Sequence, residues 1–181
     1  MQLKKIATIA LVGAAAVLSG CATQVPEYSS TANNVSTLKQ LVTKLNVGDI
    51  TATNPTKSVM CRLDSPVEMP NDATVNDYIE NAFANELKVA GIYDQNAQIT
   101  ISGNLNETDV SSSIAGAHWT FDMTVKSSNG NSFNIVHKHE YDASFFAGSA
   151  CKEDMPESFK PAVQELIHAI VADPRFKDLL S

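Results

Sequence analysis

The chain has 181 residues with 13 basic and 20 acidic side chains, a formal net charge of −7. Its length suits one domain that buries a substantial core. The acidic balance makes nucleic acid a poor partner, because binding to phosphates depends on lysine and arginine. Direct electrostatic binding to anionic lipid headgroups is not expected for the same reason.

The first twenty residues have the three-part pattern of a bacterial export signal. Lys4 and Lys5 form a short basic region, and residues 6–17 supply an uncharged apolar segment. A membrane-spanning helix needs about 20 apolar residues, and this segment is shorter and rich in alanine and glycine. We therefore predict a cleaved signal peptide over 1–20. Cleavage leaves 161 residues with 11 basic and 20 acidic side chains, a net charge of −9.

The signal ends in Leu18-Ser19-Gly20-Cys21. This segment resembles the lipobox of bacterial lipoproteins, in which a leucine and two small residues precede an invariant cysteine. The resemblance implies that Cys21 becomes the first residue and carries diacylglycerol, with a further acyl chain such as palmitate on the new N-terminus. Several acyl chains give a stable membrane anchor where one would not. An ordinary signal peptide with a chance cysteine is the alternative.

Cys61 and Cys151 are the two remaining cysteines. In an oxidising compartment the simplest outcome is one disulfide, and a loop of about 90 residues would be worth roughly 4–5 kcal/mol in the chain-entropy model. Two buried free thiols, or a haem or metal site, are the alternatives. The sequence contains no CxxC or CxxCH pattern, so we predict the Cys61–Cys151 bridge.

The first part of the mature chain reads as a tether followed by a short helix and a strand. Residues 21–34 are polar and small, which predicts a lipidated cysteine on a flexible tether. Apolar residues at helical spacing over 35–45 predict a short helix capped by Ser36 or Thr37, although the stretch could also lead into a strand. Alternation over 58–63 predicts a strand with Cys61 facing inward. Residues 64–72 contain two prolines and are predicted to be irregular.

The rest of the chain predicts a helix, three strands and a final helix. Thr74 and Asp77 resemble a capping box, and Gly91 stands where a helix ends. Strands are expected where apolar and polar residues alternate, and Asn-Gly predicts a hairpin between the last two. The predicted strands cover 99–105, 119–125 and 133–145, and the last helix begins at 156–158 and ends before Asp173-Pro174.

This order predicts an α+β two-layer sandwich: an antiparallel sheet of about four strands with two helices packed on one face. Residues 35–181 would form a single periplasmic domain.

The sequence contains no complete enzyme motif. GxSxG, P-loop, GxGxxG and HExxH patterns are absent, since His139-Glu140 begins the last of these but position 143 is alanine. We therefore predict no enzyme activity, no cofactor and no metal. The strongest metal hypothesis places His137 and His139 on one face of a strand, with His118 as the third ligand. Two histidines near the sheet rim are the simpler interpretation.

Aromatic residues suggest two further hypotheses. The strand aromatics could line a ligand pocket, but their alternation is more typical of a core; they are Trp119, Phe121, Phe133 and Tyr141. Phe145 and Phe146 are followed by small residues, and neighbours in a strand point to opposite faces. One of the two could therefore be exposed and contact a partner. The alternative is that both pack under the final helix beside Cys151.

The block from Cys61 to Leu180 resembles a group of small uncharacterised proteobacterial lipoproteins. The residues that carry the resemblance are Tyr78-Ile79, Glu86-Leu87, Ala90-Gly91, Trp119, Asn129-Gly130, Cys151 and Pro174-Arg175-Phe176. More distantly, the order of elements is similar to transport-auxiliary, LptE-like and YajG-like outer-membrane lipoproteins. Fold analogy does not carry function, and the acidic balance counts against direct binding of lipopolysaccharide.

Ala22 follows the lipobox cysteine where inner-membrane lipoproteins of the enteric type carry aspartate. The resemblance therefore implies an outer-membrane lipoprotein that faces the periplasm. The expected function is a non-catalytic accessory or interaction module of the cell envelope, with an envelope protein as a possible partner. A periplasmic lipoprotein that binds a small ligand or a metal is the alternative.

Overall fold

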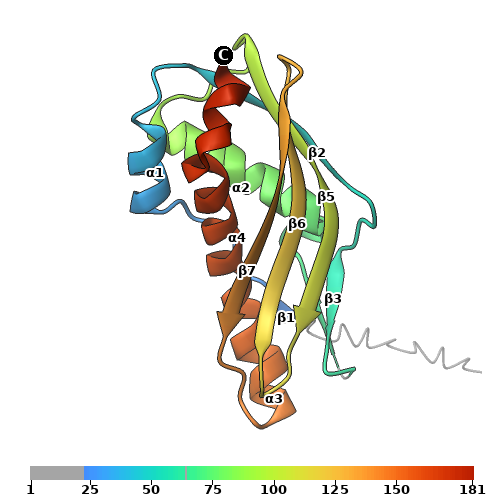
Figure 1. The fold of residues 1–181 in the computed structure, drawn as a ribbon. Coiled ribbons are helices and arrows are strands. Elements are labelled where there is room, and N and C mark those ends of the chain that lie inside the picture. The colour runs from blue at the N-terminus through green and yellow to red at the C-terminus, as the bar shows by residue number, and fades with distance from the viewer. Residues whose placement is uncertain (1–22, 64) are drawn as a thin grey trace, which may run out of the picture.

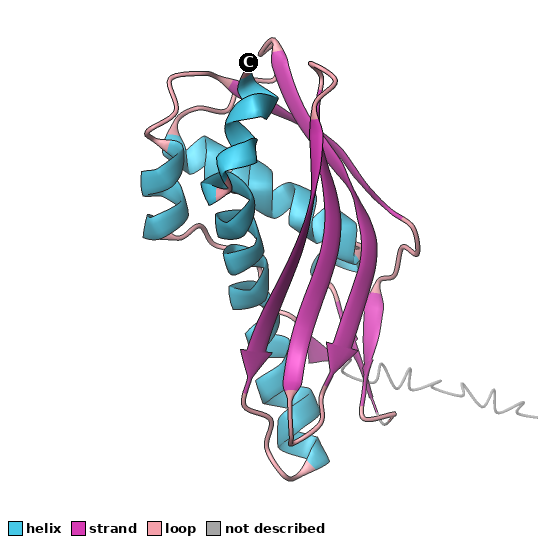
Figure 2. Cartoon of the chain, in the orientation of Figure 1, coloured by secondary structure: helices cyan, strands magenta, loops and turns pink. Residues whose placement is uncertain are grey.

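The computed structural model describes residues 23–63 and 65–181, so the predicted signal peptide and Cys21 lie outside the described residues. A twisted four-stranded sheet forms one layer, and helices cover one of its faces (Figures 1 and 2). The strand order is β2-β5-β6-β7, formed by Leu45–Ala52, Ile99–Ser111, Ala117–Ser127 and Ser132–Tyr141. The covering helices are α2 (Val75–Ala90) and α4 (Met155–Ala172). The coarse α+β layered prediction is confirmed.

The larger sheet is mixed rather than antiparallel. β5, β6 and β7 pair antiparallel, as their alternation and the Asn-Gly turn predict. β2 pairs parallel to β5, with Leu45 opposite Ile99. The expectation of a wholly antiparallel sheet is therefore wrong at this edge. β2 can pair in parallel because a long crossover that includes α2 separates it from β5 in the chain.

A second, three-stranded sheet lies beside the lower part of the molecule. Its order is β1-β4-β3, formed by Thr23–Gln24, Ser65–Glu68 and Ser58–Cys61. The predicted irregularity of 64–72 is wrong for residues 65–68. Pro66 is tolerated because it lies at the second position of its strand, and the described pairing with β1 involves only Val67 and Glu68. The strand predicted over 58–63 ends at Cys61 and belongs to this small sheet.

The predicted tether is folded over residues 23–34. Val25 is 3% exposed, and helix α1 (Ala32–Leu38) begins inside the segment. The Thr31 side chain caps α1 by accepting a hydrogen bond from the Asn34 amide, so neither Ser36 nor Thr37 is the cap. The small polar residues show no apolar period that would predict this packing, because burial here depends on partners distant in sequence.

The ends of α2 match their sequence signals. Thr74 and Asp77 form a reciprocal capping box, and Gly91 ends the helix with a left-handed φ of 76°. α4 begins at Met155, close to the predicted start, and ends before Asp173. Short helical segments complete the chain: Pro70–Asp72, α3 (Ala147–Ser149), a π-helical turn over Ala150–Asp154, and Pro174–Leu180.

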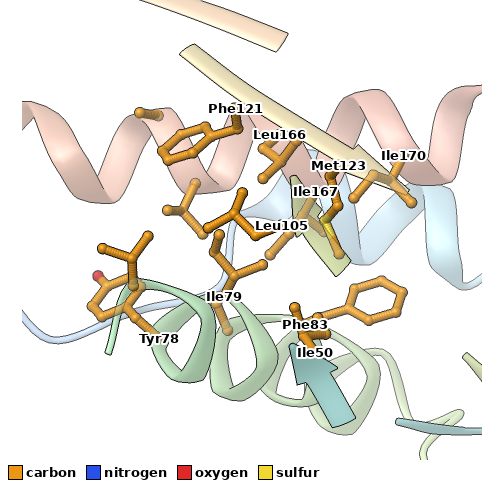
Figure 3. Close-up of a cluster of buried hydrophobic side chains, with 14 of the residues drawn as sticks. Ile50, Tyr78, Ile79, Phe83, Leu105, Phe121, Met123, Leu166, Ile167 and Ile170 are labelled. Atoms are coloured by element: carbon orange, nitrogen blue, oxygen red, sulfur yellow. The ribbon is translucent and has the colours of Figure 1, made fainter. Parts of the chain in front are cut away.

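The main core lies between α2, α4 and the four-stranded sheet (Figure 3). Each element contributes apolar residues at its own period, so helix stripes and alternate strand positions meet in one cluster. Side chains labelled in the figure include Ile79, Phe83, Met123, Leu166 and Ile170. No helix among the described residues is long and apolar enough to cross a bilayer.

Candidate functional site

Three loops meet at one end of the molecule, the lower end in Figure 1. They are the turn after β3 at 62–63, the loop 112–116 between β5 and β6, and the segment 142–146 between β7 and α3. A buried disulfide links two segments of this region, the end of β3 and the turn before α4. Cys61 and Cys151 are both buried and are joined by an S–S bond of 2.02 Å, with their Cα atoms 5.6 Å apart. The structure thus contains the bridge that the two cysteines predict.

Arg62 connects the three loops through hydrogen bonds to their backbone. Its backbone amide donates to Ser112 Oγ at 3.0 Å, and its Nε donates to the Ser112 carbonyl at 2.8 Å. The two terminal nitrogens donate to the carbonyls of Ser144 at 2.6 Å and Phe145 at 2.9 Å. A planar guanidinium presents several donors in a fixed geometry. One side chain therefore satisfies three carbonyl groups from two neighbouring loops.

Apolar side chains project from each of these loops into solvent. Leu63 is 94% exposed, Ile114 57%, Phe145 75% and Phe146 74%. The rings of Phe145 and Phe146 contact each other edge to face, with centroids 5.5 Å apart. We call these four side chains the apolar tip. Exposed apolar clusters are uncommon on monomeric domains and commonly mark contact surfaces.

Both phenylalanines lie outside the core, whereas alternation predicted that at least one of them would be exposed. β7 ends at Tyr141, so the strand geometry behind that prediction no longer applies at 145–146. Both rings are exposed instead of packed beside Cys151. Neither Leu63 nor Ile114 was predicted as a contact residue. Leu63 was assigned to the inward face of the strand predicted over 58–63, but β3 ends at Cys61 and Leu63 is exposed in the turn. Ile114 is a lone apolar residue in a polar loop and has no periodic signal.

The turn after β3 places two large residues in an unfavourable backbone conformation. Arg62 and Leu63 have φ angles of 47° and 55°. The left-handed region costs roughly 1–2 kcal/mol for a residue with a side chain. The hydrogen bonds of Arg62 and the neighbouring disulfide hold the turn in place, with the Leu63 side chain directed outward.

The three histidines of the metal hypothesis do not meet. His118 pairs with Glu140, whereas His139 pairs with Trp119, so His118 lies on the opposite face of the sheet from His139. His118 contacts Asp109 at 2.9 Å. Within 23–63 and 65–181, no group of three or more His, Cys, Asp or Glu side chains is arranged to hold a metal ion.

His137 and His139 instead share one carboxylate of helix α4. Glu165 Oε2 lies 3.4 Å from His137 Nε2 and 2.9 Å from His139 Nδ1. Partial burial would raise the pKa of Glu165, but hydrogen bonds and charge from His139 and His137 outweigh burial and lower this pKa below 4.5. This contact joins the edge strand β7 to α4.

The strand aromatics form core rather than a ligand pocket. Trp119 and Phe121 are fully buried, and the Trp119 ring nitrogen donates to Ser158 Oγ at 2.9 Å. The Trp119 and Phe159 ring centroids lie 4.8 Å apart. A surface hollow of about 420 Å³ lies elsewhere, between β3 and the lower half of β5. Its lining mixes Asn, Thr, Ser and Glu with a few apolar residues, and no titratable cluster lies in it.

A buried carboxylate ties the N-terminal segment to the domain. Glu86 is 0% exposed and its Oε1 accepts from the Tyr28 hydroxyl at 2.6 Å, the Thr31 amide at 3.0 Å and Asn34 Nδ2 at 3.1 Å. Burial, together with this hydrogen bond to Glu86, raises the pKa of Tyr28 above its ordinary value. The sequence does contain a signal for this contact, since Glu86 falls on the apolar face of α2 beside Phe83 and Leu87.

No family model matches the chain, and no curated protein matches it in sequence. Among solved structures the chain is similar to the crystal structure of protein XCC0632 from Xanthomonas campestris, of the family DUF330. The similarity covers 87% of this chain and 97% of that chain, with a TM-score of 0.53 and 11% sequence identity. At this identity the comparison establishes a shared α+β fold and carries no functional residue across.

Proposed function

We propose that this protein is a membrane-anchored periplasmic lipoprotein that acts as a non-catalytic accessory or interaction module of the cell envelope. The lipid attaches at Cys21, and Ala22 directs the protein to the outer membrane, where the domain faces the periplasm. The observation that carries the proposal is the apolar tip, a rigid exposed surface with no catalytic group on it. A contact surface of this kind suits a protein that works by binding.

Two further observations support this proposal. Lipid attachment at Cys21 would place the anchor directly before β1, which is part of the folded domain. The mature net charge of −9 is compatible with a role that does not depend on attraction to phosphate. The alternative, a small-ligand or metal-binding lipoprotein, has no comparable support, since its histidines lie on two faces of the sheet.

Metabolic labelling with palmitate tests the anchor. The wild-type protein should incorporate label and be recovered in the outer-membrane fraction. Cys21→Ala should incorporate no label and be absent from that fraction. Ala22→Asp serves as the matched control, because it should keep the label and move the protein to the inner-membrane fraction. Full labelling of Cys21→Ala would overturn the lipoprotein assignment.

A photo-crosslinking residue tests the contact surface. Placed at Phe145 in intact cells, it should give a discrete adduct, with either a protein or a lipid. The same residue at Val42, which is fully exposed near the other end of the sheet, should not. Equal or absent adducts at both positions would count against an interaction role for the apolar tip.

A further inference from the structure

The surface that the apolar tip contacts can be inferred from the position of the tip relative to the lipid site at Cys21. We propose that the apolar tip inserts into the interfacial region of the membrane that holds the lipid on Cys21, so that the domain is seated on the bilayer by two contacts. This inference rests on the proposed function, because it requires the lipid anchor. It names a lipid surface, rather than a protein, as the partner of the apolar tip.

The pairing of β1 with β4 places the start of the described domain near the apolar tip. β1 is parallel to β4, with Thr23 opposite Val67. β4 begins at Ser65, which pairs with Cys61 beside the turn that carries Leu63. Thr23 therefore lies only two residues along the strand from this turn, roughly 7 Å at the rise of a β-strand. Two residues of chain reach at most about 7 Å, so a lipid attached at Cys21 would be held within that distance of Thr23. The chain length outside the described domain is thus too short to separate the lipid from this end.

Large exposed apolar side chains are unevenly distributed over the described residues. The four residues of the apolar tip come from three loops that Arg62 joins. Met60, also exposed, lies on β3 two residues before Arg62. The other large apolar side chains that are more than half exposed in the described chain are Val42, Val89 and Val136, outside these loops. Apolar exposure thus concentrates at the end where the chain would enter the membrane.

Several backbone carbonyls in these loops have hydrogen-bond donors within the protein. A backbone carbonyl that enters an apolar phase must keep a donor inside the protein. Arg62 supplies donors to the carbonyls of Ser112, Ser144 and Phe145. The Ala150 amide donates to the Phe146 carbonyl at 3.0 Å. The carbonyls of Ser144, Phe145 and Phe146 therefore have donors within the protein, and arginine can keep its charge at the polar level.

Contacts within the domain hold these loops in place, and the exposed charges beside them are of both signs. The loops are held in place before they contact the membrane. The disulfide links them to the domain, and the Ser144 backbone amide donates a hydrogen bond to Asp154 Oδ2 at 2.7 Å. Little conformational entropy is therefore lost on insertion. The exposed charges beside the tip are of both signs, because Asp142 and Glu153 are negative and Lys152 is positive. The driving force is therefore apolar burial, and it should respond little to added salt.

The experiment uses the mature lipidated protein in vesicles of phosphatidylethanolamine and phosphatidylglycerol that contain brominated acyl chains. Phe145→Trp and, separately, Leu63→Trp place a fluorophore on the apolar tip. Val42→Trp is the matched control at the opposite end. The wild-type protein supplies the blank, because its single tryptophan, Trp119, is fully buried.

Emission from Phe145→Trp and Leu63→Trp should shift to shorter wavelength and be quenched by bromine, equally at low and high salt. Val42→Trp should show neither effect. If the protein floats with the vesicles and no tip variant is quenched, the insertion is wrong while the anchor stands. A protein adduct from the crosslinker at Phe145 would overturn it in favour of a protein partner. If the wild-type protein neither incorporates palmitate nor floats with the vesicles, the proposed function and the insertion are both wrong.

Discussion

Two of the seven phenylalanines differ from the rest in exposure. Phe145 and Phe146 are 75% and 74% exposed, whereas every other phenylalanine is at most 7% exposed. Serine at either exposed position should change the free energy of unfolding by less than about 0.5 kcal/mol, the usual range for surface sites. Phe159→Ala, the buried control, should cost about 3–5 kcal/mol. Urea denaturation measures all three. Large losses at Phe145 and Phe146 would show that their rings are packed.

A second prediction at this scale concerns Glu165 and acid. Because its folded-state pKa lies below 4.5, its contacts with His137 and His139 contribute stability above about pH 4.5. That contribution is lost as the pH falls through the lower folded-state value. The side chain is 52% exposed, so solvent screening limits the contribution to less than about 1 kcal/mol.

Glu165→Gln should therefore reduce the free energy of unfolding more at pH 7 than at pH 3. Glu157→Gln, on the exposed side of the same helix, serves as the control for removing one carboxylate. Urea unfolding curves at the two pH values give the comparison. An equal loss at both pH values would mean that Glu165 acts by packing rather than by charge.

At the scale of elements, the disulfide joins the small sheet to the segment before α4. Cys61 ends β3, and Cys151 lies in the π-helical turn that leads into α4. Reduction, or the paired change of both cysteines to alanine, should lower the free energy of unfolding by roughly 2–5 kcal/mol. Hydrogen exchange should rise first in β3 and β4, while β6 stays protected. Uniform loss of protection would show that the bridge supports the whole fold equally.

Elements with local signals were predicted well, and those set by distant partners were not. The capping box of Thr74 and Asp77 and the turn at Gly91 located α2 nearly to the residue. The Asn-Gly turn fixed the β6–β7 hairpin. By contrast, β4 pairs with the neighbouring β3 although it contains Pro66, and β2 becomes a strand through β5, a partner far along the chain. Short-range periodicity contains no information about such partners.

The candidate site was predicted in part. The sequence singled out the two cysteines and the phenylalanine pair, because cysteine number and adjacent aromatics are visible in one dimension. It did not single out Arg62, whose role depends on three loops meeting in space. It also joined His118 with His137 and His139, although strand pairing places them on opposite faces. The register needed to see this is a property of the sheet.

For the whole molecule, the N-terminal boundary of the domain is a testable difference between sequence and structure. A fragment of residues 35–181 lacks Val25, whose burial contributes roughly 1.5–3 kcal/mol. It also removes the three donors to Glu86, which leaves a buried carboxylate without partners. Together these losses should make it less stable than 23–181 by at least about 3 kcal/mol.

Thermal and urea unfolding of the two unlipidated fragments provide the measurement. Glu86→Leu within 35–181 should recover part of the loss, because no unpaired charge remains. Equal stability of the two fragments would restore residue 35 as the boundary and return 23–34 to the role of a tether.

The length of the strands determines how far the protein would extend from a membrane. β5 runs for 13 residues from Ile99 to Ser111, about 40 Å at the rise of a β-strand. The C-terminus lies at its far end, where Asn129 donates to the Ser181 carbonyl at 2.7 Å. If the end that carries the apolar tip rests on the bilayer, the strands would hold the C-terminus about 40 Å above the membrane surface. An affinity tag or a fused domain at Ser181 would then project into the periplasm and leave the membrane contact undisturbed.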